Sequence, residues 1–103
     1  MRVLLKVSMP VETANARIKD GSIGQIFQTF MEEHKPEATY FAVDSGKRTA
    51  FIFMDIQDSS QLPSIAEPFF LCLNASIECT PVMNGEDLGK GLSAVEEVVR
   101  KYG

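Results

Sequence analysis

Four polar side chains in the middle of the sequence have the chemical character needed to act on a small molecule: His34, Tyr40, Asp55 and Glu67. His34 is the only histidine of the chain, and imidazole can take up or release a proton near neutral pH. A phenol and a carboxylate at the rim of an apolar cavity can orient an aromatic or enolisable compound. Glu67 precedes Pro68, where a broken helix would open a gap beside the sheet. These four are the candidate catalytic residues.

Each of these candidates also has a plainer explanation. A histidine at a helix end commonly caps carbonyl groups and meets the negative end of the helix dipole. Aspartate is common in turns such as the one after Asp55, and Glu67 could be an exposed charge. No serine–histidine–acid set, phosphate-binding glycine loop or metal-ligand spacing accompanies them, so no cofactor or metal is expected.

Apolar spacing predicts the elements that position these groups. Ile23, Ile26, Phe27 and Phe30 follow a helical spacing that Pro36 ends, and Ser22 with Gln25 matches a capping box. Asn84 and Asp87 are expected to cap a C-terminal helix with an apolar stripe through Leu88, Leu92, Val95, Val99 and Tyr102. The remaining elements are strands at 3–9, 38–44, 49–56 and 75–82, a short helix at 11–21, and a helix at 58–74 that Pro68 kinks or splits.

This order predicts an α+β fold in a single domain, residues 1–103. It is a ferredoxin-like βαββαβ arrangement with an antiparallel sheet in the order 4-1-3-2 and an added C-terminal helix. Helices cover one face of such a sheet. The ligand pocket is expected between the helices and the sheet, lined by Phe27, Phe30, Phe51, Phe53 and Phe69.

The other face of the sheet should be polar, and the sequence predicts that it is not. Side chains alternate along a strand, so Phe51 and Phe53 point one way while Ile52 and Met54 point the other. Both faces therefore carry apolar groups. The simplest cover is a second copy of the same sheet, which predicts a homodimer packed through the sheet face. The alternative is a monomer whose own C-terminal segment covers the face.

Several other side chains have structural explanations. Lys6 and Glu78 should face the same side and form a cross-strand ion pair. Arg48 follows a glycine turn and is expected to be a solvated charge, although it could bind an anion. Cys72 and Cys79 lie among apolar neighbours and are expected to be buried, reduced thiols.

Composition excludes two classes of partner. Ten basic and fourteen acidic residues give a formal charge of −4 with no basic run, so nucleic acid is not an expected partner. No apolar run is long enough to cross a bilayer, and the N-terminus does not resemble a signal peptide. The protein is expected to be cytoplasmic, without a membrane partner.

The predicted element order, the apolar open face and the small size resemble the dimeric α+β barrel superfamily. The segments KPEATYF, GKR, AEPFF and TPVMNGEDL are similar to those of a group of small bacterial proteins in that superfamily. The resemblance implies the fold and the dimer. Superfamily members include cofactor-independent monooxygenases, isomerases, haem-degrading enzymes and ligand-sensing modules, and their motifs differ between branches.

Three functions remain open from the sequence. The first is a homodimeric small-molecule-binding protein. The second is a cofactor-independent enzyme, of monooxygenase or isomerase type, acting on a small aromatic or enolisable compound. The third is a structural or interaction module whose interior is filled by its own side chains.

Overall fold

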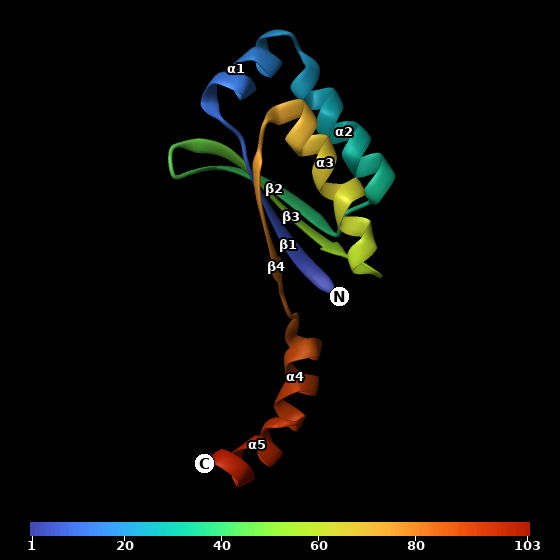
Figure 1. Ribbon diagram of the computed structural model, residues 1–103, viewed down its shortest axis with the longest axis vertical. Coiled ribbons are helices and arrows are strands. Elements are labelled where there is room, and N and C mark those ends of the chain that lie inside the picture. Colours follow the sequence, from blue (N-terminus) through green and yellow to red (C-terminus); the bar gives the residue numbers. More distant parts are fainter.

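Four strands form one antiparallel sheet in the computed structural model, which describes residues 1–103 (Figure 1). The order across the sheet is β2-β3-β1-β4, which is the expected order 4-1-3-2 read from the other edge. The central strands are β1 (Arg2–Ser8) and β3 (Lys47–Asp55), and the edges are β2 (Ala38–Asp44) and β4 (Ser76–Pro81). The edge strand β4 ends at its proline, where proline is tolerated.

The expected hairpin joins β2 to β3 through a two-residue turn. Ser45 and Gly46 have φ values of 52° and 77°. Positive φ at both central residues is the mark of a type I′ turn, whose twist matches that of the flanking strands. The short turn fixes the register, which pairs Tyr40 with Phe51 and Val43 with Arg48.

Three helices pack on one face of the sheet (Figure 1). They are α1 (Val11–Lys19), α2 (Ser22–His34) and α3 (Leu62–Leu73), the last preceded by a 3₁₀ turn (Ser59–Gln61). The predicted split at Pro68 is wrong, because α3 continues as one helix through this residue. Ile65, Phe69 and Leu73 are buried on both sides of the proline, so packing holds the helix together despite the missing backbone donor.

The predicted capping box of Ser22 with Gln25 is also wrong. The residue before α2 is Gly21, in the left-handed region at φ 79°, and no side chain caps the helix. The Ser22 amide donates instead to Asp20 Oδ1 at 2.9 Å, and the Ser22 hydroxyl has no partner. Only two residues separate α1 from α2, so this aspartate lies close enough to take the first free amide of α2.

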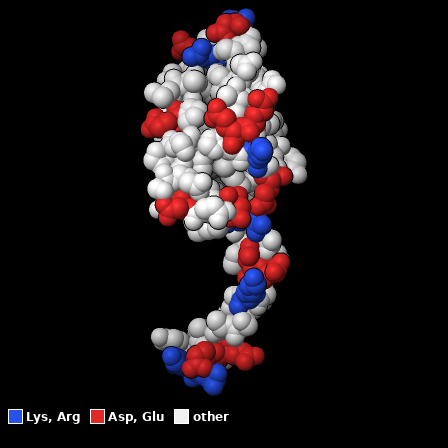
Figure 2. All heavy atoms as spheres, turned by 90° about the vertical axis from the view of Figure 1, so that its right-hand side faces the viewer, with Lys and Arg blue, Asp and Glu red and all other residues white.

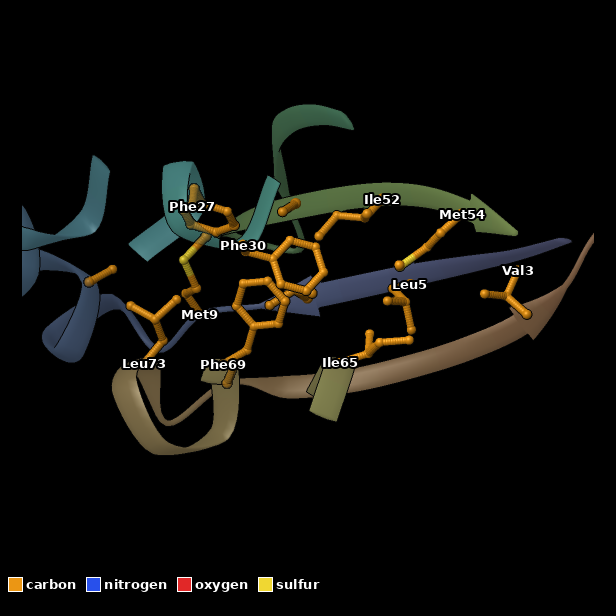
Figure 3. Close-up of a cluster of buried hydrophobic side chains, with 14 of the residues drawn as sticks. Val3, Leu5, Met9, Phe27, Phe30, Ile52, Met54, Ile65, Phe69 and Leu73 are labelled. Atoms are coloured by element: carbon orange, nitrogen blue, oxygen red, sulfur yellow. The ribbon is translucent and has the colours of Figure 1, made fainter. Parts of the chain in front are cut away.

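The core lies between the helices and the sheet (Figure 3). Alternate residues of β1 and β3 point into it, while the helices contribute aromatic and branched side chains. Phe30 packs on Phe69 with ring centroids 4.6 Å apart, and Phe27 lies 5.4 Å from Phe69. Phe69 is fully buried, so this ring cluster fills the centre of the space under the helices.

No helix covers the opposite face of the sheet, which we call the open face (Figure 1). The register places Leu4 beside Phe53 and Lys6 beside Phe51, with Tyr40 next in the row. Tyr40 is 64% exposed, and the other apolar groups of this row are half-buried. The β4 side of the open face carries polar residues, Ser76, Glu78 and Thr80. The apolar part of the open face therefore covers β1, β2 and β3.

The C-terminal segment, which we call the arm, leaves the body altogether (Figure 1). It consists of two helices, α4 (Gly85–Ser93) and α5 (Val95–Tyr102), rather than the one expected. The capping pair is confirmed: the Asp87 amide donates to Asn84 Oδ1 at 2.8 Å, and the Asn84 amide donates to Asp87 Oδ2 at 3.1 Å. The alternative in which this segment covers the open face of its own chain is not observed.

The carboxylate that caps the 3₁₀ turn should make stability depend on acid pH. Hydrogen bonds from the Ser60 hydroxyl, and then from backbone amides, hold the pKa of Asp58 below its ordinary value. This contribution is present above the ordinary aspartate pKa of about 4 and is lost as pH falls through the lower folded value. We expect Asp58→Asn to reduce the decrease in the free energy of unfolding between neutral and acid pH, measured by urea unfolding. An unchanged slope would contradict this role.

Candidate ligand pocket

The most apolar pocket of the molecule opens between the start of α2 and the hairpin end of the sheet. Its volume is about 480 Å³. Nine residues line it, and six of them are hydrophobic. They are Met9, Ile23, Gly24, Phe27, Phe41, Ala42, Val43, Arg48 and Thr49. A pocket of this size and character is within the usual range for small-molecule sites.

Aromatic packing shapes the back of this pocket. Phe27 from α2 meets Phe41 from β2 edge to face, with ring centroids 5.1 Å apart. Phe27 is buried and is held from behind by the ring of Phe69, whereas Phe41 is 55% exposed. One wall is therefore fixed by the core, and the other is a ring on an edge strand that a ligand could cover.

Arg48 is the only charged residue that lines the pocket. Its side chain is half-buried, and Nη1 donates to Asn15 Oδ1 at 2.9 Å. Its backbone carbonyl accepts from the Met9 amide at 3.0 Å. No carboxylate lies within ion-pair distance of the guanidinium group. The expectation of a freely solvated charge is wrong, because α1 holds this side chain in place beside apolar surface.

A glycine forms part of the pocket wall on α2. A Cβ built on Gly24 would have no heavy atom within 4 Å outside its own helical turn. The wall is therefore open at this point and has room for an added Cβ. The sequence carries this signal only weakly, since a glycine in a helix is seldom read as a pocket wall.

The four candidate catalytic residues do not meet in one site. His34 ends α2 and packs its ring 4.7 Å from that of Phe30. Tyr40 lies on the open face, 6.5 Å from Phe53 between ring centroids. Glu67 is exposed on α3. None of these three lines the apolar pocket.

Asp55, the fourth candidate, is part of an ion pair at the other end of the sheet. Its Oδ1 accepts from the N-terminal ammonium group of Met1 at 2.9 Å, and this hydrogen bond lowers the pKa of the carboxyl group. The carboxylate thus has a partner of its own and does not lie beside the apolar pocket.

The five phenylalanines expected to line one pocket lie on two sides of the sheet. Phe27 and Phe30 on α2 and Phe69 on α3 are buried on the helix side of the sheet, and only Phe27 reaches the apolar pocket. Phe51 and Phe53 pair with Lys6 and Leu4 on the open face. The expected lining is therefore wrong. The reason is the alternation of side chains along β3, which directs its odd-numbered residues at this point away from the helices.

Lys6 and Glu78 are paired in register on the open face, as expected. The ion pair of Lys6, however, is with Asp44, at 2.7 Å between Nζ and Oδ2. This hydrogen bond raises the pKa of Lys6. Cys79 is exposed and Cys72 half-buried, so full burial is wrong for both, and they form no disulfide.

No three His, Cys, Asp or Glu side chains come together in a group that could hold a metal ion. None of the helices has the length and apolarity required to cross a bilayer. The sequence matches no protein-family model, and a search of curated proteins finds no match.

Gly24 gives a direct test of the pocket wall. We expect Gly24→Ala to raise the free energy of unfolding by about 0.5–1 kcal/mol, because alanine favours the helix and its Cβ meets open space. Urea unfolding measures this change. Gly21→Ala is the matched control and should destabilise the protein, because Gly21 has φ 79°. A loss of stability for Gly24→Ala would mean that the wall is already filled.

Proposed function

We propose that the protein is a small-molecule-binding module that works as a homodimer, and that its ligand is a small, mainly apolar compound with one anionic group. The observation that carries the proposal is Arg48, an unpaired cation held against an otherwise apolar pocket. A cation without a carboxylate partner in such a place is free to form a charge-assisted hydrogen bond with a ligand.

The pocket walls and the guanidinium group would each contact a different part of the ligand. Apolar contact with Phe27, Phe41 and Met9 favours a flat hydrocarbon or aromatic body. The planar guanidinium group matches a carboxylate or sulfonate, and the bond from Nη1 to Asn15 reduces the side-chain freedom lost on binding. Most of the affinity would come from burial, while the cation sets which end of the ligand lies outward.

Binding without turnover is the function that this pocket favours. Its lining contains no histidine, tyrosine, aspartate or glutamate. The Thr49 hydroxyl donates to the Lys47 carbonyl rather than into the pocket. General acid–base chemistry needs a titratable group within hydrogen-bond reach of the reacting atom, and the pocket offers none that titrates near neutral pH.

The dimer is supported by the open face. Leu4, Tyr40, Phe51 and Phe53 place apolar side chains on this face from three strands, with Lys6 beside Phe51. Exposed apolar side chains that lie together on one face are common at subunit interfaces. In a two-fold dimer the same row meets itself, so one surface would satisfy both chains.

Arg48→Met tests the role of the cation in binding. A charge-assisted hydrogen bond contributes about 1.5–3 kcal/mol, so the variant should bind anilinonaphthalene sulfonate about tenfold to a hundredfold more weakly. The neutral probe phenylnaphthylamine has the same aromatic skeleton without the sulfonate, and its affinity should stay within about twofold of the wild-type value. Fluorescence titration measures both.

Two further variants serve as controls for this titration. Lys47→Met removes a neighbouring cation that does not line the pocket, so it should leave both affinities unchanged. Gly24→Leu should weaken both probes, since it fills the pocket, whereas Gly24→Ala should not. If Arg48→Met and Lys47→Met weaken the sulfonate equally, the proposed ligand site is wrong.

A charge on the open face should separate the subunits. We expect Phe53→Lys to convert a dimer to a folded monomer at micromolar concentration, because a lysine there would be buried without a partner. Light scattering after gel filtration measures the mass. Phe70→Lys is the matched control, since Phe70 is 41% exposed on the outer side of α3. Equal effects of the two substitutions would argue against the open face as the interface.

A further inference from the structure

The arm carries a row of apolar side chains that nothing in its own chain covers. Leu88, Leu92, Val95, Val99 and Tyr102 follow each other at helical spacing, and their exposed fractions run from 41% to 83%. The two arm helices contact each other, but neither packs extensively on a strand or helix of the body. The row therefore has no partner within its own chain.

Contacts at the base of the arm fix its course away from the body. Only three residues separate β4 from α4. The Val82 amide donates to the Arg2 carbonyl at 3.0 Å, and Arg2 Nη1 donates to Asp87 Oδ2 at 3.0 Å. Arg2 Nε is held in turn by both carboxylate oxygens of Glu37, at 3.0 Å each. A turn of the start of α4 towards the sheet would break these bonds.

The size of the uncovered surface matches what a stable dimer needs. The chain exposes 6858 Å², about 1,100 Å² more than a compact monomer of its mass. Its radius of gyration is 17.2 Å, against about 13 Å for a compact chain of this length. A standard interface buries about 800 Å² on each partner. The surplus on one chain is therefore enough for one such interface.

The arm helices also need outside support to persist. They have nine and eight residues, and α4 contains Gly85, Gly89 and Gly91. Isolated helices shorter than about 12 residues are marginal in water, and glycine weakens them further. Their stability must come from packing of the apolar row against another surface.

Charge on the arm argues against a lipid surface as that partner. Its polar side carries Glu86, Asp87, Glu96 and Glu97 beside Lys90, Arg100 and Lys101. Figure 2 shows acidic and basic groups side by side along the arm. A helix that binds anionic lipid usually has a basic polar face. Mixed charge is instead usual on a helix that packs on protein.

We infer that the arm of each chain packs through Leu88, Leu92, Val95, Val99 and Tyr102 on the body of a second copy of this chain. The inference rests on the proposed dimer and adds an exchange of arms to it. A second copy is favoured because each chain exposes about 1,100 Å² more surface than a compact monomer, which is enough for one subunit interface. A two-fold dimer would satisfy both chains at once and leave no free arm to recruit further copies.

A mixed-label experiment tests the exchange in the full-length chain. One preparation is isotope-labelled for amide spectra. The other is unlabelled and carries a nitroxide at Lys101→Cys, on the polar side of the arm, with Cys72→Ala and Cys79→Ser to remove the other thiols. After subunit exchange, a nitroxide can broaden labelled amides only between chains. We expect amide signals from one contiguous region of the labelled body to lose more than half their intensity, and to recover it when the nitroxide is reduced.

Substitutions in the arm supply the matched control. Placing Leu92→Glu and Val99→Glu in the nitroxide chain should abolish the broadening, while Lys90→Ala on the polar side should leave it in place. The inference is overturned if a dimer shows no broadening of body signals, or broadening of arm signals alone. In either case the proposal of a dimer through the sheet face would still hold. A folded monomer would overturn both, as would a monomer that sediments with anionic vesicles through its arm. Probe binding at Arg48 is measured separately and is not decided by any of these outcomes.

Discussion

The structure depends on a sheet that has apolar groups on both faces but helices on only one. Burial of Phe30 and Phe69 against the covered face supplies the core. Strands β2 and β3 also present Tyr40, Phe51 and Phe53 on the open face, because successive side chains of a strand point to opposite faces of the sheet. Removal of that second surface from water would add stabilisation of the same kind, and one chain has nothing with which to cover it. The uncovered open face is therefore the feature of the fold on which the proposed dimer depends.

The apolar pocket lies at the edge of the hydrophobic core, towards the hairpin end of the sheet. The ring cluster under the helices ends at Phe27, and β2 continues beyond it towards the hairpin turn. Gly24 leaves the adjacent part of α2 without a side chain, so the space is not filled. Arg48 enters this gap from the start of β3 and is steadied by Asn15 on α1. The pocket is thus lined by α2 and the hairpin strands together, while α1 holds its one charged side chain.

Much of the architecture could be predicted from the sequence, because it depends on local patterns. Alternation in β3, the positive-φ turn at Gly46 and the Asn84 cap are readable over a few residues. The site could not be predicted in this way. The partner of Lys6 is Asp44 rather than the paired Glu78, and Arg48 is held by a side chain 33 residues away. Such contacts depend on sheet twist and helix placement, which sequence spacing does not encode.

If one chain alone leaves too much apolar surface in water, the protein should associate in solution. Sedimentation equilibrium of the unaltered protein, from nanomolar to micromolar concentration, tests it most directly. We expect the mass of two chains throughout the micromolar range, with dissociation only on further dilution. A single-chain mass at micromolar concentration, in a sample that remains folded and soluble, would contradict it.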